Sequence, residues 1–261
     1  MIRRFFSQAW LSFKAHTAAF QLDEFLLFET AYPLLTLIFY CVLAGYSFQT
    51  TELTHWVVGN SFLLCVNTCV FSLGGGFCAE RYNGRIRSIM VAPSSKLAFI
   101  LEQGFFQILI AAITVFIGFF AGSLIFGVDF TGINIGLLLL VIIIAMFSAS
   151  GFGLMLSSLG LLTDGMHLVL NLASYVLMIF CGANFPVSQL PRAGQVISRL
   201  LPLTRSIEAA DMLFEATPNM PFFTWLLIGE ILIGVIFFLV AFAVVKSAER
   251  IAIRRASLEL F

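Results

Sequence analysis

Six long apolar runs, separated by polar segments, are the feature that most constrains the fold of this chain. They lie at about 27–47, 57–79, 97–126, 134–158, 165–183 and 221–245. A helix needs about 20 mostly apolar residues to cross a hydrocarbon core about 30 Å thick, and each run meets that length. Only 11% of the 261 residues are charged and 30 are Phe, unlike a soluble domain. The runs predict an all-α polytopic membrane protein with six transmembrane helices, since helices satisfy their backbone hydrogen bonds in lipid.

The distribution of Lys and Arg predicts the orientation of these spans. Eleven of the fourteen cations lie in the N-terminus, in the loop 80–96 and in a tail over 246–261. Six spans place these segments on one side, and short loops rich in Lys and Arg stay in the cytoplasm. The other three cations, Arg192, Arg199 and Arg205, lie in 184–220, which the same count places outside. We therefore predict a single transmembrane domain over 1–261 in the cytoplasmic (inner) membrane, with both termini and the tail in the cytoplasm.

The first twenty residues predict an amphipathic helix lying in the membrane interface, over 1–20. Apolar residues recur at i, i+3 and i+4 spacing, with Leu11 as the exception, whereas Arg3, Arg4 and Lys14 fall on the opposite side. The apolar set is Ile2, Phe5, Phe6, Ala9, Trp10 and Phe13. Such a helix either anchors the chain or joins the cytosolic side to the first span, and the pattern leaves both interpretations open.

Residues 80–93 form a short charged segment between the second and third runs. Ile86, Ile89 and Met90 share one helical face, and cations cover the rest. A helix of this kind can dock an apolar ridge into a groove of a partner protein. The alternative is a loop whose charges only keep it in the cytosol.

The segment 184–220 is broken by four prolines, Pro186, Pro191, Pro202 and Pro218. Proline interrupts a helix, so the pieces are too short to span a membrane. We expect short helices in a hairpin that dips back from the outer face, with the arginines at the headgroups or a cavity mouth.

The chain lacks the motifs of an enzyme. It has no G-x-x-x-x-G-K-[ST], and none of its three lysines follows a glycine-rich loop. His16, His55 and His167 are scattered and no H-E-x-x-H is present, which disfavours an intramembrane protease. The five cysteines lie in or beside apolar runs without ligand partners at zinc spacing, which favours packing over a metal site. We expect no catalytic centre, metal or bound cofactor, and a net charge of zero with no basic stripe predicts no nucleic acid.

Polar residues inside the spans are candidates for function. One stripe on the second span consists of Asn60, Leu64, Asn67 and Phe71, and one on the fifth consists of Asn171, Tyr175 and Met178. These stripes either line a mostly apolar pathway or hold helices together. Glu102 is expected at the cytosolic mouth, whereas Glu29 and Glu230 could be interfacial or buried, and the sequence does not decide between these.

Two stretches resemble type-2 ABC transporter permeases. The first, Glu80, Gly84, Arg85, Ile86, Ile89 and then Ala92-Pro93, resembles the cytoplasmic loop of that family. The second, with Phe185-Pro186, Leu190-Pro191, Ile197 and Leu201-Pro202-Leu203, resembles the stretch after its fifth span. Asp211 departs from the pattern, because many members carry an Arg there. The role of that Arg is therefore not carried over.

The resemblance implies partners and site residues. It implies a coupling helix that sits in a groove of a separate ABC ATPase, with ATP and Mg bound by that partner. Two ATPase copies and a second permease subunit, identical or a close paralogue, complete the complex. It further implies re-entrant helices between spans five and six. The residues concerned are Glu80, Gly84, Arg85, Ile86, Arg87, Ile89 and Pro93 for coupling, Asn67, Phe71, Asn171, Tyr175 and Met178 for the pathway, and Phe185, Pro186, Pro191 and Pro202 for an exit gate.

The resemblance also favours export of a small lipophilic or amphipathic molecule. The main alternative is a lipid-linked glycan. Permeases for such glycans tend to carry a basic, tyrosine-containing stretch before the first span, where this chain has Gln21-Leu22-Asp23-Glu24-Phe25. A proton-coupled secondary transporter is less favoured, because such proteins often contain internal repeats and none relates 1–130 to 131–261.

Overall fold

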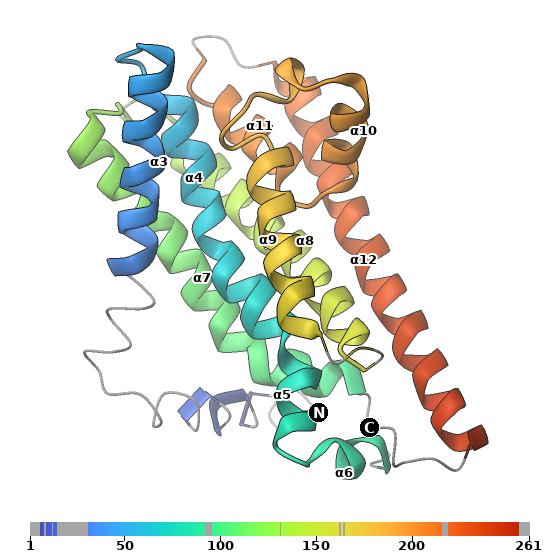
Figure 1. The fold of residues 1–261 in the computed structure, drawn as a ribbon. Helices are drawn as coiled ribbons and strands as arrows, with labels where there is room; N and C mark the ends of the chain where they lie inside the picture. Colours follow the sequence, from blue (N-terminus) through green and yellow to red (C-terminus); the bar gives the residue numbers. More distant parts are fainter. Residues whose placement is uncertain are drawn as a thin grey trace.

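The computed structural model describes residues 6–7, 9–11, 13–14, 31–91, 96–130, 132–161, 163, 165–215 and 219–255, and contains helices but no strand over these residues (Figure 1). The long elements are α3 (Tyr32–Phe48), α4 (Thr54–Val66), α7 (Lys96–Phe126), α8 (Ile135–Leu159), α9 (Met166–Phe180) and α12 (Met220–Arg255). The short ones are a π-helix η2 (Asn67–Leu73), α5 (Gly76–Tyr82), α6 (Ile86–Val91), a 3₁₀ turn η3 (Val187–Gln189), α10 (Arg192–Leu200) and α11 (Thr204–Met212). The all-α prediction is confirmed for the described residues.

Four stretches are long and apolar enough to cross a membrane, namely Thr54–Tyr82, Gly104–Phe126, Ile135–Leu159 and Met220–Arg250. The first of them joins α4, η2 and α5. The other two predicted spans correspond to α3 and α9, which have 17 and 15 residues. At 1.5 Å per residue these rise about 25 and 23 Å, less than a full hydrocarbon core. The polytopic prediction is confirmed and the count of six stays a prediction; residues 27–30 of the first run lie outside the described residues.

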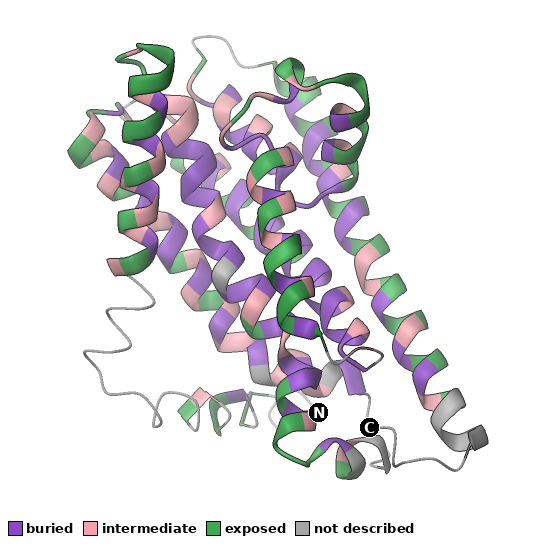
Figure 2. Ribbon diagram, viewed as in Figure 1, coloured by how far each residue is buried: buried purple, intermediate pink, exposed green. Residues whose placement is uncertain are grey.

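Helix α8 is one of the two most buried stretches of the bundle, together with Thr54–Tyr82, whose most apolar part is 65% buried (Figure 2). In the apolar stretch of α8, 61% of the residues are buried, against 22% in the stretch of α12. Glycine permits this packing, because a Cβ at Gly153 would lie 2.2 Å from the backbone oxygen of Cys69 in η2. A backbone atom cannot move aside cheaply, so α8 and η2 approach only where no side chain intervenes.

The outer helices α3, α9 and α12 expose large apolar side chains. Examples are Leu35 and Phe39 on α3, Leu168 and Leu172 on α9, and Ile228, Leu232 and Leu239 on α12. Rows of exposed apolar residues on several helices would be unfavourable in water and are stable against lipid or another membrane protein. The surface of the bundle therefore agrees with the membrane assignment that the composition predicts.

The N-terminal residues that are described lie against the start of α7. Phe6 contacts Phe105 edge to face, with ring centroids 5.3 Å apart, and the rings of Trp10 and Phe13 each lie 5.4 Å from that of Phe106. Part of the predicted apolar face therefore packs on protein. Residues 1–5 and 15–20 lie outside the described residues, so an interfacial position of the helix stays a prediction.

Short helices gather at both ends of the bundle. In Figure 1, α5 and α6 lie near the end of α12 that finishes at Arg255, and α10 and α11 lie at the opposite end. The predicted loop 80–93 contains two helices, because α5 continues to Tyr82 and α6 begins only at Ile86. The tail predicted over 246–261 is a continuation of α12 as far as 255, and 256–261 lie outside the described residues.

Candidate functional site

A clamped turn joins α5 and α6. Gly84 has φ +69°, a left-handed conformation that glycine adopts without penalty. Nε and Nη2 of Arg85 donate to the two carboxylate oxygens of Glu80 over 2.8 and 2.9 Å, and the backbone N–H of Arg85 donates to the Glu80 carbonyl. The Glu80 side chain is 4% exposed and that of Arg85 62%. This bidentate ion pair fixes the direction in which α6 leaves the bundle.

Ile86 faces the interior of its own chain. It is 1% exposed and belongs to an apolar cluster with residues of α5, α7, α8 and α12, including Phe77, Ile100, Leu154 and Val245. The predicted docking ridge is therefore corrected at Ile86, because neighbouring spans already cover this side chain.

The exposed residues of the turn are Tyr82, Asn83, Gly84, Arg85 and Ser88, and Ile89 is half-buried. The side chain of Arg87 and the whole of Pro93 lie outside the described residues. A coupling role for the loop stays a prediction. Among the described side chains of this turn, the exposed ones are mostly polar.

A second ion pair joins α7 to the far end of α12. Nζ of Lys96 lies 3.2 Å from Oε1 of Glu249, and the Lys96 side chain is 9% exposed. The start of the third predicted span is thus tied to the C-terminal extension of the last one, on the side of the bundle that carries α6.

The two polar stripes lie in different surroundings. Asn60 is 2% exposed and Leu64 5%, so both pack inside the bundle, as the helix-packing interpretation expects. Phe71 is half-buried on η2, and the side chain of Asn67 is outside the described residues. A π-helix in the middle of a span is a frequent feature of functional sites, and no apolar count along the sequence could have revealed it.

On α9, Asn171 is exposed and its Nδ2 donates back to the carbonyl of His167 over 2.8 Å. Tyr175 is 59% exposed. Met178 is half-buried and accepts a hydrogen bond from the hydroxyl of Tyr40 on α3 at 3.0 Å. Asn171 and Tyr175 therefore lie on an outward face, which is open to lipid or to a second subunit.

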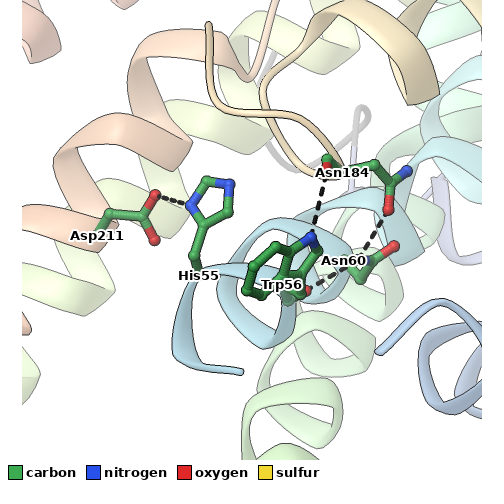
Figure 3. Close-up of polar contacts among 5 residues, drawn as sticks. All are labelled: His55, Trp56, Asn60, Asn184 and Asp211. Carbon is green, nitrogen blue, oxygen red and sulfur yellow. Dashed lines mark hydrogen bonds and ion pairs between the residues drawn. The ribbon is translucent and has the colours of Figure 1, made fainter. Parts of the chain in front are cut away.

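At the other end of the bundle, polar contacts connect α4 with the segment after α9 (Figure 3). Nε1 of Trp56 donates to the Asn184 carbonyl over 3.1 Å, and Nδ2 of Asn60 donates to Oδ1 of Asn184 over 3.2 Å. Nδ2 of Asn184 donates in turn to the carbonyl of Met178 at 3.1 Å. These bonds hold the end of α9 against the start of the second span.

In the same cluster, Nδ1 of His55 lies 2.6 Å from Oδ2 of Asp211 on α11 (Figure 3). Burial raises the pKa of the Asp211 carboxyl, and the hydrogen bond from His55 opposes that rise. Sequence reasoning missed this pair, because the two residues are 156 positions apart. The one available signal was the acidic residue at 211, where the family resemblance leads one to expect Arg, but this residue alone does not identify His55 as its partner.

Glu230 is a fully buried carboxylate on α12. Its Oε1 accepts a hydrogen bond from the hydroxyl of Ser148 on α8 and another, of 2.6 Å, from the backbone N–H of Leu203. Leu203 precedes α11 with φ +71°, a left-handed conformation that is unfavourable for Leu. The sequence left open whether Glu230 is interfacial or buried, and the structure shows that it is buried. Glu102 is half-buried, and Glu29 lies outside the described residues.

The prolines of the predicted exit gate lie at the breaks between short elements. Pro186 precedes η3, Pro191 precedes α10, and Pro202 lies between α10 and α11. Phe185 is 44% exposed. The predicted fragmentation into short helices is confirmed, and the re-entrant path through a membrane stays a prediction. Within the described part of the chain, no three His, Cys, Asp or Glu side chains gather as a metal site.

A family model described as ABC-2 type transporter matches residues 24–214. This range contains the α5–α6 turn, η2, α9, α10 and α11, and thus all of the predicted site residues. No curated protein matches the chain.

Proposed function

The chain belongs to the ABC-2 type transporter family, and from this premise we propose that it is the permease subunit of an ATP-driven exporter in the cytoplasmic membrane. Two copies of a separate ABC ATPase would supply the energy and bind the ATP and Mg. A second permease subunit, identical or closely related, would complete the pathway. The cargo we propose is a small lipophilic or amphipathic molecule. Both termini and the α5–α6 turn would then lie in the cytoplasm, and α10 and α11 would lie outside.

The observation that carries this proposal is the α5–α6 turn together with the buried position of Ile86. The exposed side of the turn, with Tyr82, Asn83 and Arg85, is available to an ATPase. On the inner side, Ile86 packs in one cluster with α5, α7, α8 and α12. Close-packed interiors transmit displacement, so movement of α6 would be passed to several spans at once.

The exposed side of the turn, which would contact the ATPase, and its buried side, which packs on the spans, predict different mutant phenotypes. Arg85→Glu reverses a charge on the exposed side and places a second carboxylate beside that of Glu80, where the two repel each other. Ile86→Ala shortens only the buried side. We expect R85E to lower co-purification of the ATPase with the tagged full-length chain, and I86A to retain the ATPase but to uncouple hydrolysis from export.

The measurement is ATPase recovered and ATP hydrolysed per permease, with export followed in intact cells. Arg250→Glu is the matched control, because Arg250 is also exposed near the same end of the bundle. A complex in which R85E changes neither ATPase recovery, hydrolysis nor export would remove the coupling role from this turn.

For the pathway, we propose that a second permease subunit faces the outward side of α9. Asn171 and Tyr175 supply polar groups there, and Phe71 and Asn67 belong to the span beside it. A cysteine at Tyr175 should then form cross-links between two permease subunits, and cargo should reduce them. Leu239 on α12 is a matched control, since it is similarly exposed at 62%. Equal cross-linking at both positions would instead indicate random collision in the membrane.

A further inference from the structure

Buried polar atoms that lack a hydrogen-bond partner are concentrated around α11. Among the described residues there are nine such side-chain atoms, and seven belong to this region. They are Nε2 of His55, Oγ1 of Thr204, Nε and Nη1 of Arg205, Oγ of Ser206, Oδ1 of Asp211 and Oε2 of Glu230. Each such group costs about 1–3 kcal/mol of folding free energy, and more if it is charged. Such a cluster of buried polar atoms is a place where ordered water or a ligand can supply the missing hydrogen bonds.

A pocket of about 1010 Å³ is lined mainly by residues of α10, α11 and the segment around η3, and three of the residues with unpaired atoms, His55, Arg205 and Asp211, belong to its lining. Its lining includes Arg192, Arg199 and Arg205. These are the three cations that depart from the distribution of Lys and Arg in the rest of the sequence. Their positions around one cavity can explain why they depart from the charge distribution. A site that binds an anion needs cations on whichever side of the membrane it lies.

Two ion pairs neutralise part of the charge in this pocket. Nη1 of Arg199 lies 2.6 Å from Oε2 of Glu208, and His55 is paired with Asp211. Arg192 is exposed and makes no ion pair with any described residue. Arg205 interacts electrostatically with Glu230. Its Nε and Nη1 nevertheless lack hydrogen-bond acceptors. Two guanidinium groups with unused donors therefore line the cavity, and that planar fork fits phosphate and carboxylate oxygens.

The remaining lining is largely apolar. Val196 and Leu200 of α10 are 62% and 63% exposed, and Ile233 follows Glu230 by about one turn on α12. The pocket thus places cationic donors beside a surface that accepts an alkyl chain. We propose that this pocket binds an amphipathic anion, with its phosphate or carboxylate on Arg192 and Arg205 and its alkyl part against Val196, Leu200 and Ile233. The site is separate from the α5–α6 turn and from the outward face of α9, so the inference does not rest on the proposed transport cycle.

Gly229 positions one of the two cationic ligands. A Cβ at Gly229 would lie 2.8 Å from Cδ and Nε of Arg205, so the Arg205 side chain packs directly over this glycine of α12. Gly229→Ala should displace the guanidinium without changing any charge in the pocket. Comparison of this variant with R205Q separates the effect of the position of Arg205 from the effect of its charge.

The test uses the purified full-length chain in phosphatidylcholine nanodiscs, with radiolabelled dodecyl phosphate as the probe and empty nanodiscs to subtract partition into lipid. We expect saturable binding that weakens at least tenfold in R205Q and in R192Q and several-fold in G229A. Arg250→Gln should bind like the unmodified chain, because Arg250 lies at the opposite end of α12. Arg192 is exposed, so R192Q remains informative even if R205Q unfolds.

Competing compounds test the chemistry of the site and its source. Dodecyltrimethylammonium should compete poorly, and inorganic phosphate should compete only at much higher concentration than dodecyl phosphate. Suppression of binding in nanodiscs that contain anionic phospholipid would support a lipid headgroup as the occupant, and its absence would support a free amphipathic anion. Equal binding of the cationic and anionic amphiphiles would overturn the proposal, as would unchanged affinity in both arginine variants.

Discussion

Two left-handed turns, one at each end of the bundle, connect pairs of short helices in different ways. Gly84 joins α5 to α6 with φ +69°, and Leu203 joins α10 to α11 with φ +71°. Glycine pays no penalty for this conformation, whereas another L-residue loses about 1–2 kcal/mol. The first turn is therefore relaxed and the second is strained.

The surroundings of the two turns match this difference. A Cβ at Gly84 would meet no atom within 4 Å, and the Glu80–Arg85 ion pair beside it is satisfied and partly exposed. Leu203 is 0% exposed, and its N–H is held by the buried carboxylate of Glu230. Strained backbone persists only where its surroundings enforce it, and it is common where a protein binds or moves. The left-handed backbone at Leu203 is thus supported by a buried carboxylate, whereas the left-handed backbone at Gly84 needs no such support.

The largest expected effect comes from removing that support. Glu230→Leu leaves the Leu203 N–H buried without an acceptor and leaves the Ser148 hydroxyl only its hydrogen bond to the Ala145 carbonyl, which together should lower the free energy of unfolding by about 3 kcal/mol. Glu230→Gln is the matched control, because it keeps an oxygen and the side-chain volume. Thermal unfolding of the purified chain measures both. If the two variants lose the same stability, the hydrogen bonds to Glu230 do not hold the turn.

The second effect should appear at the other turn. Gly84→Val forces a β-branched residue into a left-handed conformation and should cost about 1–2 kcal/mol, while the open space excludes a steric clash. Under the proposed function it should also lower ATP hydrolysis by the complex several-fold, because α6 is re-aimed. Gly84→Asn tests the cause, since Asn tolerates this conformation and should behave almost like Gly. Equal losses for Val and Asn would assign the effect to added volume rather than to backbone strain.

The sequence predicted the parts of the molecule that follow from periodicity and chain breaks. Length and apolarity of the runs placed most ends of the long helices within a few residues, because solvation in lipid depends on the composition of each segment by itself. The exception is α12, which continues past the predicted end at 245 to Arg255. The prolines at 186, 191 and 202 predicted the short helices after α9 for a similarly local reason. Gly84 was singled out by the family resemblance, and its left-handed conformation was not predicted.

The contacts between distant segments could not be predicted. His55 with Asp211 and Ser148 with Glu230 are pairs from different helices, and no spacing along the chain relates them. The π-helix at 67–73 is equally hidden, because its residues read as an ordinary apolar span. Ile86 was predicted to face a partner, since helical spacing shows that residues share a face but not which neighbour covers it.

The smallest expected effect is the difference in stability between a glycine and an alanine variant, which should have opposite signs at Leu203 and at Leu201. Leu203→Ala removes a buried side chain and leaves the left-handed strain in place, whereas Leu203→Gly removes the same side chain and relieves the strain. The glycine variant should therefore be the more stable of the two by about 1 kcal/mol. Leu201 is the matched control, because it is also buried but has φ −85°. There glycine should be less stable than alanine by about 0.5–1 kcal/mol, owing to its greater freedom in the unfolded chain. Thermal unfolding of the four variants gives both differences. The same sign at both positions would mean that Leu203 carries no strain, and the contrast between the two ends of the bundle would then rest on their ion pairs and unpaired polar atoms alone.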